Sequence, residues 1–120
     1  MKLSEAIRIG SKMKPVGVGS KSCVPTADNV CALGAAACAR GLQGTESSIY
    51  ATLYEEWPIL RARVSPVEPH YGGFRGNLME RIWLLNDVKL WSREAIADYV
   101  EQAEQEYEEC HAQVSETPQV

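Results

Sequence analysis

One stretch of the sequence decides the fold, and it reads Val30-Cys31-Ala32-Leu33-Gly34-Ala35-Ala36-Ala37-Cys38-Ala39. Alanine is the strongest helix former, and small side chains on several faces of a helix let neighbouring backbones approach closely. Thr26 or Asp28 can act as the N-cap, and Gly41 suits the left-handed position that follows a helix. We therefore expect a buried central helix over residues 27–40.

Four more segments show apolar residues at helical spacing: 3–14, 45–57, 77–85 and 92–110. Pro15 and Pro58 end the first two of them, and Asn77 with Glu80 has the spacing of a capping box. Asn86-Asp87 is interpreted as the turn after the segment 77–85, because both side chains can satisfy local backbone groups.

The predicted fold class is therefore mainly α, a small single-domain bundle of about five helices. We expect this domain to occupy residues 1–110 and to be followed by a flexible tail over 111–120. The glycine-rich and proline-rich stretches 16–24 and 61–76 leave room for a short hairpin.

Composition excludes several classes of protein. The chain has 120 residues, of which 45% are hydrophobic and 23% charged, which is ordinary for a soluble globular domain. No uncharged apolar run reaches the roughly 18–20 residues that a membrane-spanning helix needs. The N-terminus carries Glu5 and lacks the apolar core of a signal peptide. We expect a cytoplasmic protein that does not contact the membrane.

Charge is unevenly distributed along the chain. The net charge is −4, to which residues 92–120 contribute −7 and residues 1–91 contribute +3. A nucleic-acid binder should show a concentrated basic face, so we expect no nucleic-acid partner. The acidic segment is interpreted as a solvated helix face, with a docking surface for a basic partner as the alternative.

The four cysteines are Cys23, Cys31, Cys38 and Cys110. Cys31 and Cys38 fall in one predicted helix, which places their Cα atoms roughly 10 Å apart, beyond the ~7 Å limit for a disulfide. Reduced thiols that pack as small apolar side chains are expected in a cytoplasmic chain. Zinc needs about four Cys or His ligands in close local pairs, but the chain has no Cys-x₂-Cys or His-x₃-His pair, and Cys110-His111 falls at the predicted end of the last helix. We predict no metal and no cofactor.

Several motifs occur together in a recognisable order. They are Cys31-Ala32-Leu33-Gly34-Ala35-Ala36, a tyrosine-rich segment ending in Trp57-Pro58, Ile82-Trp83-Leu84-Leu85-Asn86-Asp87, and Trp91-Ser92-Arg93-Glu94. In this respect the chain resembles a group of small uncharacterised bacterial and bacteriophage proteins, over most of residues 3–105. The resemblance implies a phage or prophage origin and carries no established activity.

The leading hypothesis is a non-enzymatic interaction or accessory protein. Tyr71, Phe74 and Arg75 lie together in the irregular stretch 61–76. Exposed aromatic residues beside arginine are favoured at protein interfaces, so we predict that these three residues bind a protein partner. A two-fold homodimer is also compatible with the apolar stripes of five small helices.

The alternative hypothesis is a small cysteine-dependent hydrolase or transferase. Cys31 lies near the start of the predicted central helix, where the helix dipole favours a thiolate. In this interpretation His70 is the general base, and Asn86 or Asp87 orients the histidine. The environment of Cys31 discriminates between the two hypotheses.

Overall fold

The computed structural model describes residues 1–63 and 76–116, with side chains as far as Cys110. Within these residues the α-helices are α1 (Leu3–Ser11), α2 (Ala32–Arg40), α3 (Ile49–Glu56), α4 (Leu78–Trp83) and α5 (Arg93–Glu116). Shorter turns are η1 (Ser20–Cys23) and η2 (Pro58–Arg61), both 3₁₀-helical, and η4 (Leu84–Val88), which is π-helical. The mainly α, single-domain prediction is confirmed. Isolated bridges join Val16 to Val30 and Arg63 to Asn77.

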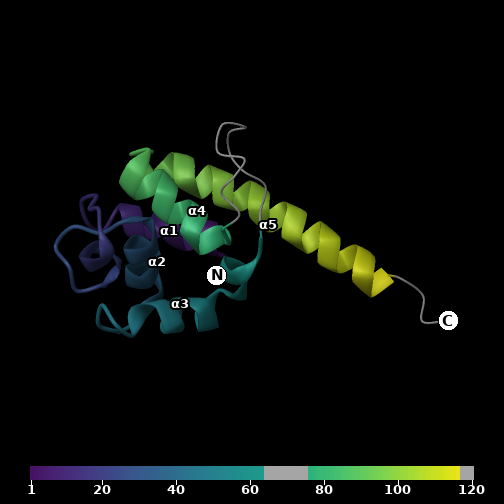
Figure 1. The fold of residues 1–120 in the computed structure, drawn as a ribbon, viewed down its shortest axis with the longest axis horizontal. Helices are drawn as coiled ribbons and strands as arrows, with labels where there is room; N and C mark the ends of the chain where they lie inside the picture. Colours follow the sequence, from purple (N-terminus) through teal and green to yellow (C-terminus); the bar gives the residue numbers. More distant parts are fainter. Residues whose placement is uncertain (64–75, 117–120) are drawn as a thin grey trace.

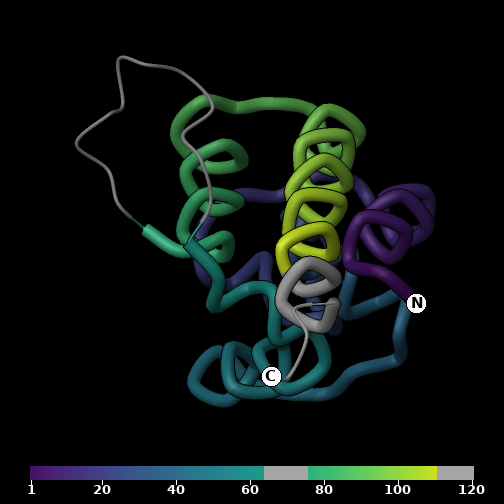
Figure 2. Tube along the Cα trace, turned by 90° about the vertical axis from the view of Figure 1, so that its right-hand side faces the viewer, coloured from purple at the N-terminus to yellow at the C-terminus, as the bar shows by residue number. Residues whose placement is uncertain are grey.

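The helices form a body from which the long helix α5 runs outward (Figure 1). In the view turned by 90°, α5 has α1 on one side and α4 on the other, and α3 lies below them (Figure 2). The core contains side chains from every helix, among them Ile7, Leu33, Leu53, Ile82 and Val100. In the described part of the chain, no helix combines the length and apolar character that crossing a membrane requires.

Helix α1 crosses α2 at very close range. A Cβ atom built on Gly10 would lie 1.7 Å from the carbonyl oxygen of Ala35, so only glycine fits at this crossing. Residues 35–37 of α2 are all alanines and all fully buried. The small side chains of α2 therefore let another backbone pack against it, as the sequence predicts.

The start of α2 differs from the prediction. The helix was expected from residue 27, but it begins at Ala32. Val30 instead donates its N–H to the Pro15 carbonyl at 2.8 Å and accepts from the Gly17 N–H at 3.0 Å. These bonds hold Val30 beside the loop after α1. Cys31, expected inside the helix, becomes its N-cap.

The beginning of α3 and the region around Asn86 also correct the sequence interpretation. Helix α3 begins at Ile49 instead of residue 45, because the Ser48 hydroxyl binds the Thr45 N–H at 2.9 Å in a preceding turn. Asn86 and Asp87 were expected in the turn after the segment 77–85. They lie in the π-helical continuation of α4, where Asn86 is only 3% exposed. The predicted capping box of Asn77 and Glu80 is present.

Acidic side chains of α5 hold α1 in place. Arg8 of α1 forms 2.7 Å ion pairs with both Asp98 and Glu101, and the pKa of Arg8 is raised by these bonds. Glu104 is buried and accepts hydrogen bonds from the backbone N–H and the hydroxyl of Ser4. Since Lys2 gives α1 no side-chain cap, Glu104 acts as its N-terminal cap from another helix.

Helix α5 is longer than the sequence predicts. It was expected to end near residue 110 but continues to Glu116. Among the described side chains of α5, Glu104 is the last that is buried, and those from Glu108 to Cys110 are exposed. The distal part of α5 therefore projects from the body (Figure 1).

Candidate functional site

Two thiols meet where α2 begins. Cys31 is the N-cap of α2, and Cys23 is the last residue of the turn η1. Their Sγ atoms lie 3.2 Å apart, and each residue is 4% exposed. The pair is thus a close, buried contact between residues eight positions apart in the sequence.

Gly34 makes this contact geometrically possible. The Cys31 N–H donates to the Ser22 carbonyl at 3.1 Å, which fixes the backbone of η1 beside the start of α2. A Cβ atom on Gly34 would lie 2.1 Å from that same Ser22 oxygen. The absence of a side chain at Gly34 therefore lets η1 approach α2 closely enough for Cys23 to reach Cys31.

Hydrogen bonds make the two thiols unequal. The pKa of Cys31 is lowered to about 7, first by the hydrogen bond from Cys23 and then, against the opposing effect of burial, by the Gly34 N–H at 3.4 Å. The pKa of Cys23 is raised, because this thiol donates to Cys31 and is itself buried. Of the two, Cys31 is therefore the thiol that ionises more readily, and Cys23 is the one that keeps its proton.

Tyr50 of α3 adds a further donor to the pair. Its hydroxyl lies 3.9 Å from the Cys23 Sγ. Burial raises the pKa of Tyr50 to about 12, so the phenol keeps its proton at neutral pH. This contact acts on Cys23, whose pKa it lowers against the larger raising effects of Cys31 and burial.

Asn86 and Asp87 hold the loop before η1 against α2. The Asn86 Oδ1 accepts from the Ala32 N–H at 3.2 Å, and its Nδ2 donates to the Gly17 carbonyl at 3.0 Å. Asp87 accepts from the Asn86 amide at 2.8 Å and from the Gly19 N–H at 3.0 Å. In the described structure the pair positions the loop and the helix that carry the two thiols.

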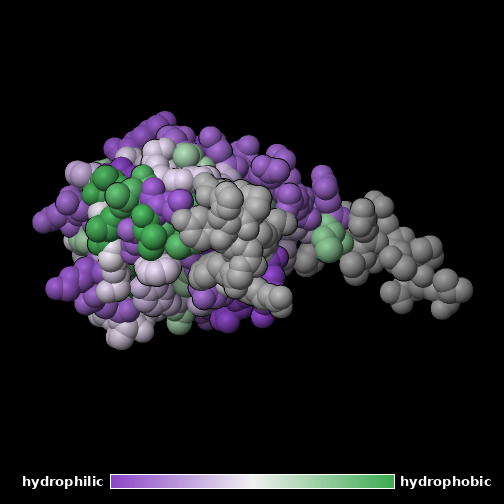
Figure 3. Space-filling model, turned by 45° about the horizontal axis from the view of Figure 1, so that its top comes forward, coloured by the Kyte–Doolittle hydropathy of each residue, from purple (hydrophilic) through white to green (hydrophobic). Residues whose placement is uncertain are grey.

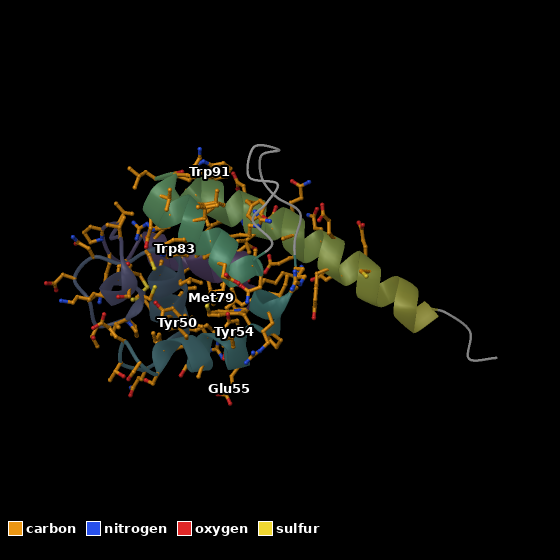
Figure 4. All side chains as sticks on the ribbon, in the orientation of Figure 1. Tyr50, Tyr54, Glu55, Met79, Trp83 and Trp91 are labelled. Carbon is orange, nitrogen blue, oxygen red and sulfur yellow. The ribbon has the colours of Figure 1, made fainter. Side chains whose placement is uncertain are left out.

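A cavity of about 190 Å³ connects the thiols with the surface. Its lining consists mainly of apolar and aromatic side chains from α2, α3 and α4, and includes Cys23, Cys31, Tyr50, Met79 and Trp83. Figure 4 shows Met79 of α4 and Tyr50 of α3 in the space between these two helices. Trp83 is 48% exposed, so the cavity reaches solvent on its side.

The structure brings together some of the predicted site residues. Cys31, Asn86 and Asp87 all line the cavity. His70 of the alternative catalytic set lies outside the described residues, as do the predicted binding residues Tyr71, Phe74 and Arg75. In the described part of the chain, no three His, Cys, Asp or Glu side chains gather as metal ligands would.

Sequence reasoning missed the role of Cys23. The predicted partner for comparison with Cys31 was Cys38, further along the same helix. In the structure, the Cys38 thiol donates a hydrogen bond to the Pro25 carbonyl at 3.3 Å. The available signal was a glycine three residues after a cysteine at a helix start, with a second cysteine in the short loop before it. Tyr50 carried no signal, because its approach to Cys23 depends on how α3 packs.

Apolar residues also gather on the surface at the end of the molecule away from the C-terminus (Figure 3). In the loop after α1 and the region after α4, exposed apolar side chains are Val16, Val18, Val88 and Leu90, with exposed fractions between 54% and 70%. Leu90 also has a φ of 55°, a left-handed conformation that is unfavourable for leucine.

Comparisons with known proteins identify no relative: no protein-family model, no curated protein and no solved structure matches the chain.

Proposed function

We propose that this protein is a cytoplasmic interaction or accessory protein without enzymatic activity, which holds one apolar side chain of a protein partner in the cavity between α3 and α4. The observation that carries the proposal is the size and lining of that cavity. Clefts that bind drug-sized ligands typically measure about 300–1,000 Å³, whereas an apolar cavity of about 150 Å³ accepts benzene. At about 190 Å³, this cavity suits a single aromatic or large aliphatic group.

The rim of the cavity favours an anchor residue with a basic neighbour. Trp83 is half exposed there, and tryptophan is among the residues that dominate binding energy at interfaces. Glu80 is exposed, Asp87 is partly exposed, and both line the cavity. An apolar residue next to lysine or arginine in the partner would fill the cavity and place its positive charge beside these carboxylates.

The aromatic loop supplies the second part of the proposal. Tyr71, Phe74 and Arg75 follow one another closely in the sequence, a few residues before α4 begins at Leu78. Aromatic and arginine side chains in this position would enlarge the contact around a partner segment already anchored in the cavity. We propose that both regions contact the same partner.

Selection from a peptide library tests the proposed function. Peptides are selected on the wild-type chain and counter-selected on a Met79→Trp variant, whose larger side chain fills the cavity. The selected peptides should share an aromatic or large aliphatic residue beside lysine or arginine. Their affinity should fall about tenfold or more in Trp83→Ala, as expected for a central aromatic contact. It should stay unchanged in Glu55→Gln, which alters an exposed residue of α3 that does not line the cavity.

Two results would contradict the proposed function. One is a selection that recovers no peptide preferring the wild type to Met79→Trp, provided that thermal unfolding shows the variant to be folded. The other is a set of peptides that bind Trp83→Ala as tightly as the wild type. A Tyr71→Ala/Phe74→Ala double variant tests the loop separately. It should lower the affinity of long peptides and leave unchanged the affinity of the shortest peptides, which contact only the cavity.

The second candidate is the cysteine-dependent hydrolase or transferase. The observation that favours it is the lowered pKa of Cys31, a thiolate beside an apolar cavity. An acyl-transfer enzyme needs a base, for which His70 is the sequence candidate. Hydrolysis of a small activated ester should then turn over in the wild type and stop in both Cys31→Ser and His70→Ala. Turnover that survives either substitution eliminates this candidate.

A further inference from the structure

We propose that Cys23 and Cys31 form a reactive dithiol that exchanges with small disulfides entering the cavity and is converted into an internal Cys23–Cys31 disulfide. The partner molecule is a disulfide of low molecular weight, with neutral or cationic groups preferred over anionic ones. This reaction is stoichiometric, and it does not depend on the peptide binding proposed above.

The positions of the two residues support closure of the bond. The Sγ atoms are 3.2 Å apart, and a disulfide requires about 2.05 Å, so each sulfur has to move little. The hydrogen bond from the Cys31 N–H to the Ser22 carbonyl already holds the two backbone segments side by side. Formation of the disulfide therefore requires rotation of the two side chains and no refolding of the backbone.

The environment assigns different roles to the two sulfurs. Cys31 is the N-cap of α2 and accepts a hydrogen bond from the Gly34 N–H, and its Sγ lies 3.2 Å from that of Cys23. Because the backbone donor at the helix start is on Cys31, we assign Cys31 as the attacking thiolate. Cys23 keeps its proton until Cys31 has reacted, because the negative charge on Cys31 and burial both oppose its ionisation. Cys23 then acts as the resolving thiol.

The exchange balances in two steps. The Cys31 thiolate attacks one sulfur of the small disulfide. The bond between its two sulfurs breaks, a mixed disulfide forms on Cys31, and the first small thiolate leaves and takes a proton from water. Cys23 then loses its proton and attacks the Cys31 Sγ, which releases the second small thiol with that proton. Overall, two protein thiols are oxidised and one small disulfide is reduced to two thiols.

The lining of the cavity sets the selectivity. Both thiols line it, and the exposed residues Glu80 and Trp83 connect it with the surface. Its volume of about 190 Å³ admits a small disulfide such as cystamine but is tight for glutathione disulfide. Because Glu80 and Asp87 are acidic, cationic cystamine should react faster than neutral hydroxyethyl disulfide, and anionic glutathione disulfide should react slowest.

The test uses the full chain with Cys38→Ser and Cys110→Ser, which leaves only the pair. The folded protein is treated with each disulfide near neutral pH and analysed by intact mass and by peptide mapping without reduction. With cystamine, we expect the Cys23–Cys31 disulfide and no retained adduct. Adding Cys23→Ser should instead retain one cysteamine on Cys31. Cystamine should react about tenfold or more faster than glutathione disulfide, a difference that shrinks at high salt.

Three outcomes would overturn the proposal. The first is that Cys23 and Cys31 stay reduced in the folded chain under conditions that oxidise them in the same chain unfolded in denaturant. The second is a Cys31→Ser variant that captures cysteamine on Cys23 as fast as Cys23→Ser captures it on Cys31. The third is a set of rates that does not depend on the charge of the disulfide.

Serine variants of buried cysteines can be unstable, so a measurement on the wild type accompanies them. Brief alkylation with iodoacetamide, followed by peptide mapping, should modify Cys31 before Cys23. Modification of Cys23 first contradicts the assigned roles. A Tyr50→Phe variant removes the hydroxyl 3.9 Å from Cys23 while keeping the ring. Cys23 should then be alkylated still more slowly than Cys31, because its pKa loses a hydrogen bond that lowers it. Faster alkylation of Cys23 in this variant would contradict the assigned roles.

Discussion

Replacing Gly34 by alanine adds one methyl group at the point where the turn η1 meets α2. The added Cβ would lie 2.1 Å from the Ser22 carbonyl oxygen and 3.0 Å from the Val30 Cβ. Real Cβ atoms essentially never approach another atom closer than 3.0 Å, so the Ser22 backbone has to move by about 1 Å. The residue that follows Ser22 is Cys23, and it has to move with it.

The cost can be worked out from the contacts involved. Overpacking of this kind costs about 1–3 kcal/mol, and weakening the bond from the Cys31 N–H to the Ser22 carbonyl costs about 1 kcal/mol more. Alanine offsets about 0.5–1 kcal/mol of this loss of stability, because it is a better helix former than glycine. The free energy of unfolding should therefore fall by about 2 kcal/mol, although glycine-to-alanine changes inside helices usually stabilise.

The same displacement should change the chemistry of Cys31. A shift of about 1 Å takes the sulfurs from 3.2 Å to the outer limit of a hydrogen bond. Cys31 then loses its strongest stabilising donor, and its pKa should rise toward the ordinary cysteine value of about 8.5. The pH midpoint of Cys31 alkylation should move upward by about one pH unit or more.

Two measurements on Gly34→Ala check this: denaturant unfolding, and the pH profile of iodoacetamide labelling mapped to Cys31. The matched control is Ile96→Val, a fully buried site on α5 that should lose about 1 kcal/mol without moving the midpoint. A Gly34→Ala variant that is as stable as the wild type and has the same labelling midpoint would refute the geometry assigned to η1 and α2.

Three further predictions concern stability. Gly10→Ala should destabilise by about 3 kcal/mol or more, because its Cβ meets the Ala35 backbone at 1.7 Å and the two helices have to separate; a melting temperature at or above that of the wild type argues against the close crossing. Glu104→Ala should cost about 2 kcal/mol and reduce the hydrogen-exchange protection of the first turn of α1, since Ser4 loses its acceptor; uniform loss of protection across the chain would contradict a local capping role. Leu90→Gly should stabilise by about 1 kcal/mol in denaturant unfolding, because Leu90 has a φ of 55° and is 70% exposed, and a destabilised variant would show that Leu90 packs in solution.

The parts of the fold that local chemistry determines could be predicted from the sequence. The capping box of Asn77, the left-handed Gly41 after α2 and the small-residue interior of α2 all depend on residues close together in the chain. At α3 the boundary was wrong for a local reason, the turn in which Ser48 binds Thr45. At α2 and Asn86 the prediction was wrong because a distant segment supplied the hydrogen bond. The start of α2 moved to Ala32 because Pro15 and Gly17 bind Val30. Asn86 became a buried cap because the α2 N-terminus lay beside it.

The candidate site was predictable only in part, for the same reason. Cys31 could be singled out because a cysteine at a helix start has a local effect, the stabilisation of its thiolate. Its partner Cys23 was missed, because the contact between the two depends on how closely the Ser22 carbonyl oxygen packs against Gly34, and the sequence indicates this only through a glycine three residues after Cys31. Asp87 was assigned to orient a histidine, whereas its described partners are the Asn86 amide and the Gly19 N–H.

The projecting end of α5 has a consequence for how the protein unfolds. After Arg93 the helix carries no lysine or arginine, and acidic side chains continue toward its C-terminus, where the helix dipole disfavours them. Among the described side chains of this end, those from Glu108 to Cys110 are exposed, and the ion pair of Glu108 with Lys2 lies at the surface, where such pairs contribute little. The distal turns should therefore melt before the body. Trp57, Trp83 and Trp91 all lie in the body, so their fluorescence reports only the later event. Helical ellipticity should thus begin to fall at temperatures where the tryptophan signal is still native, and a single two-state temperature will not describe the chain.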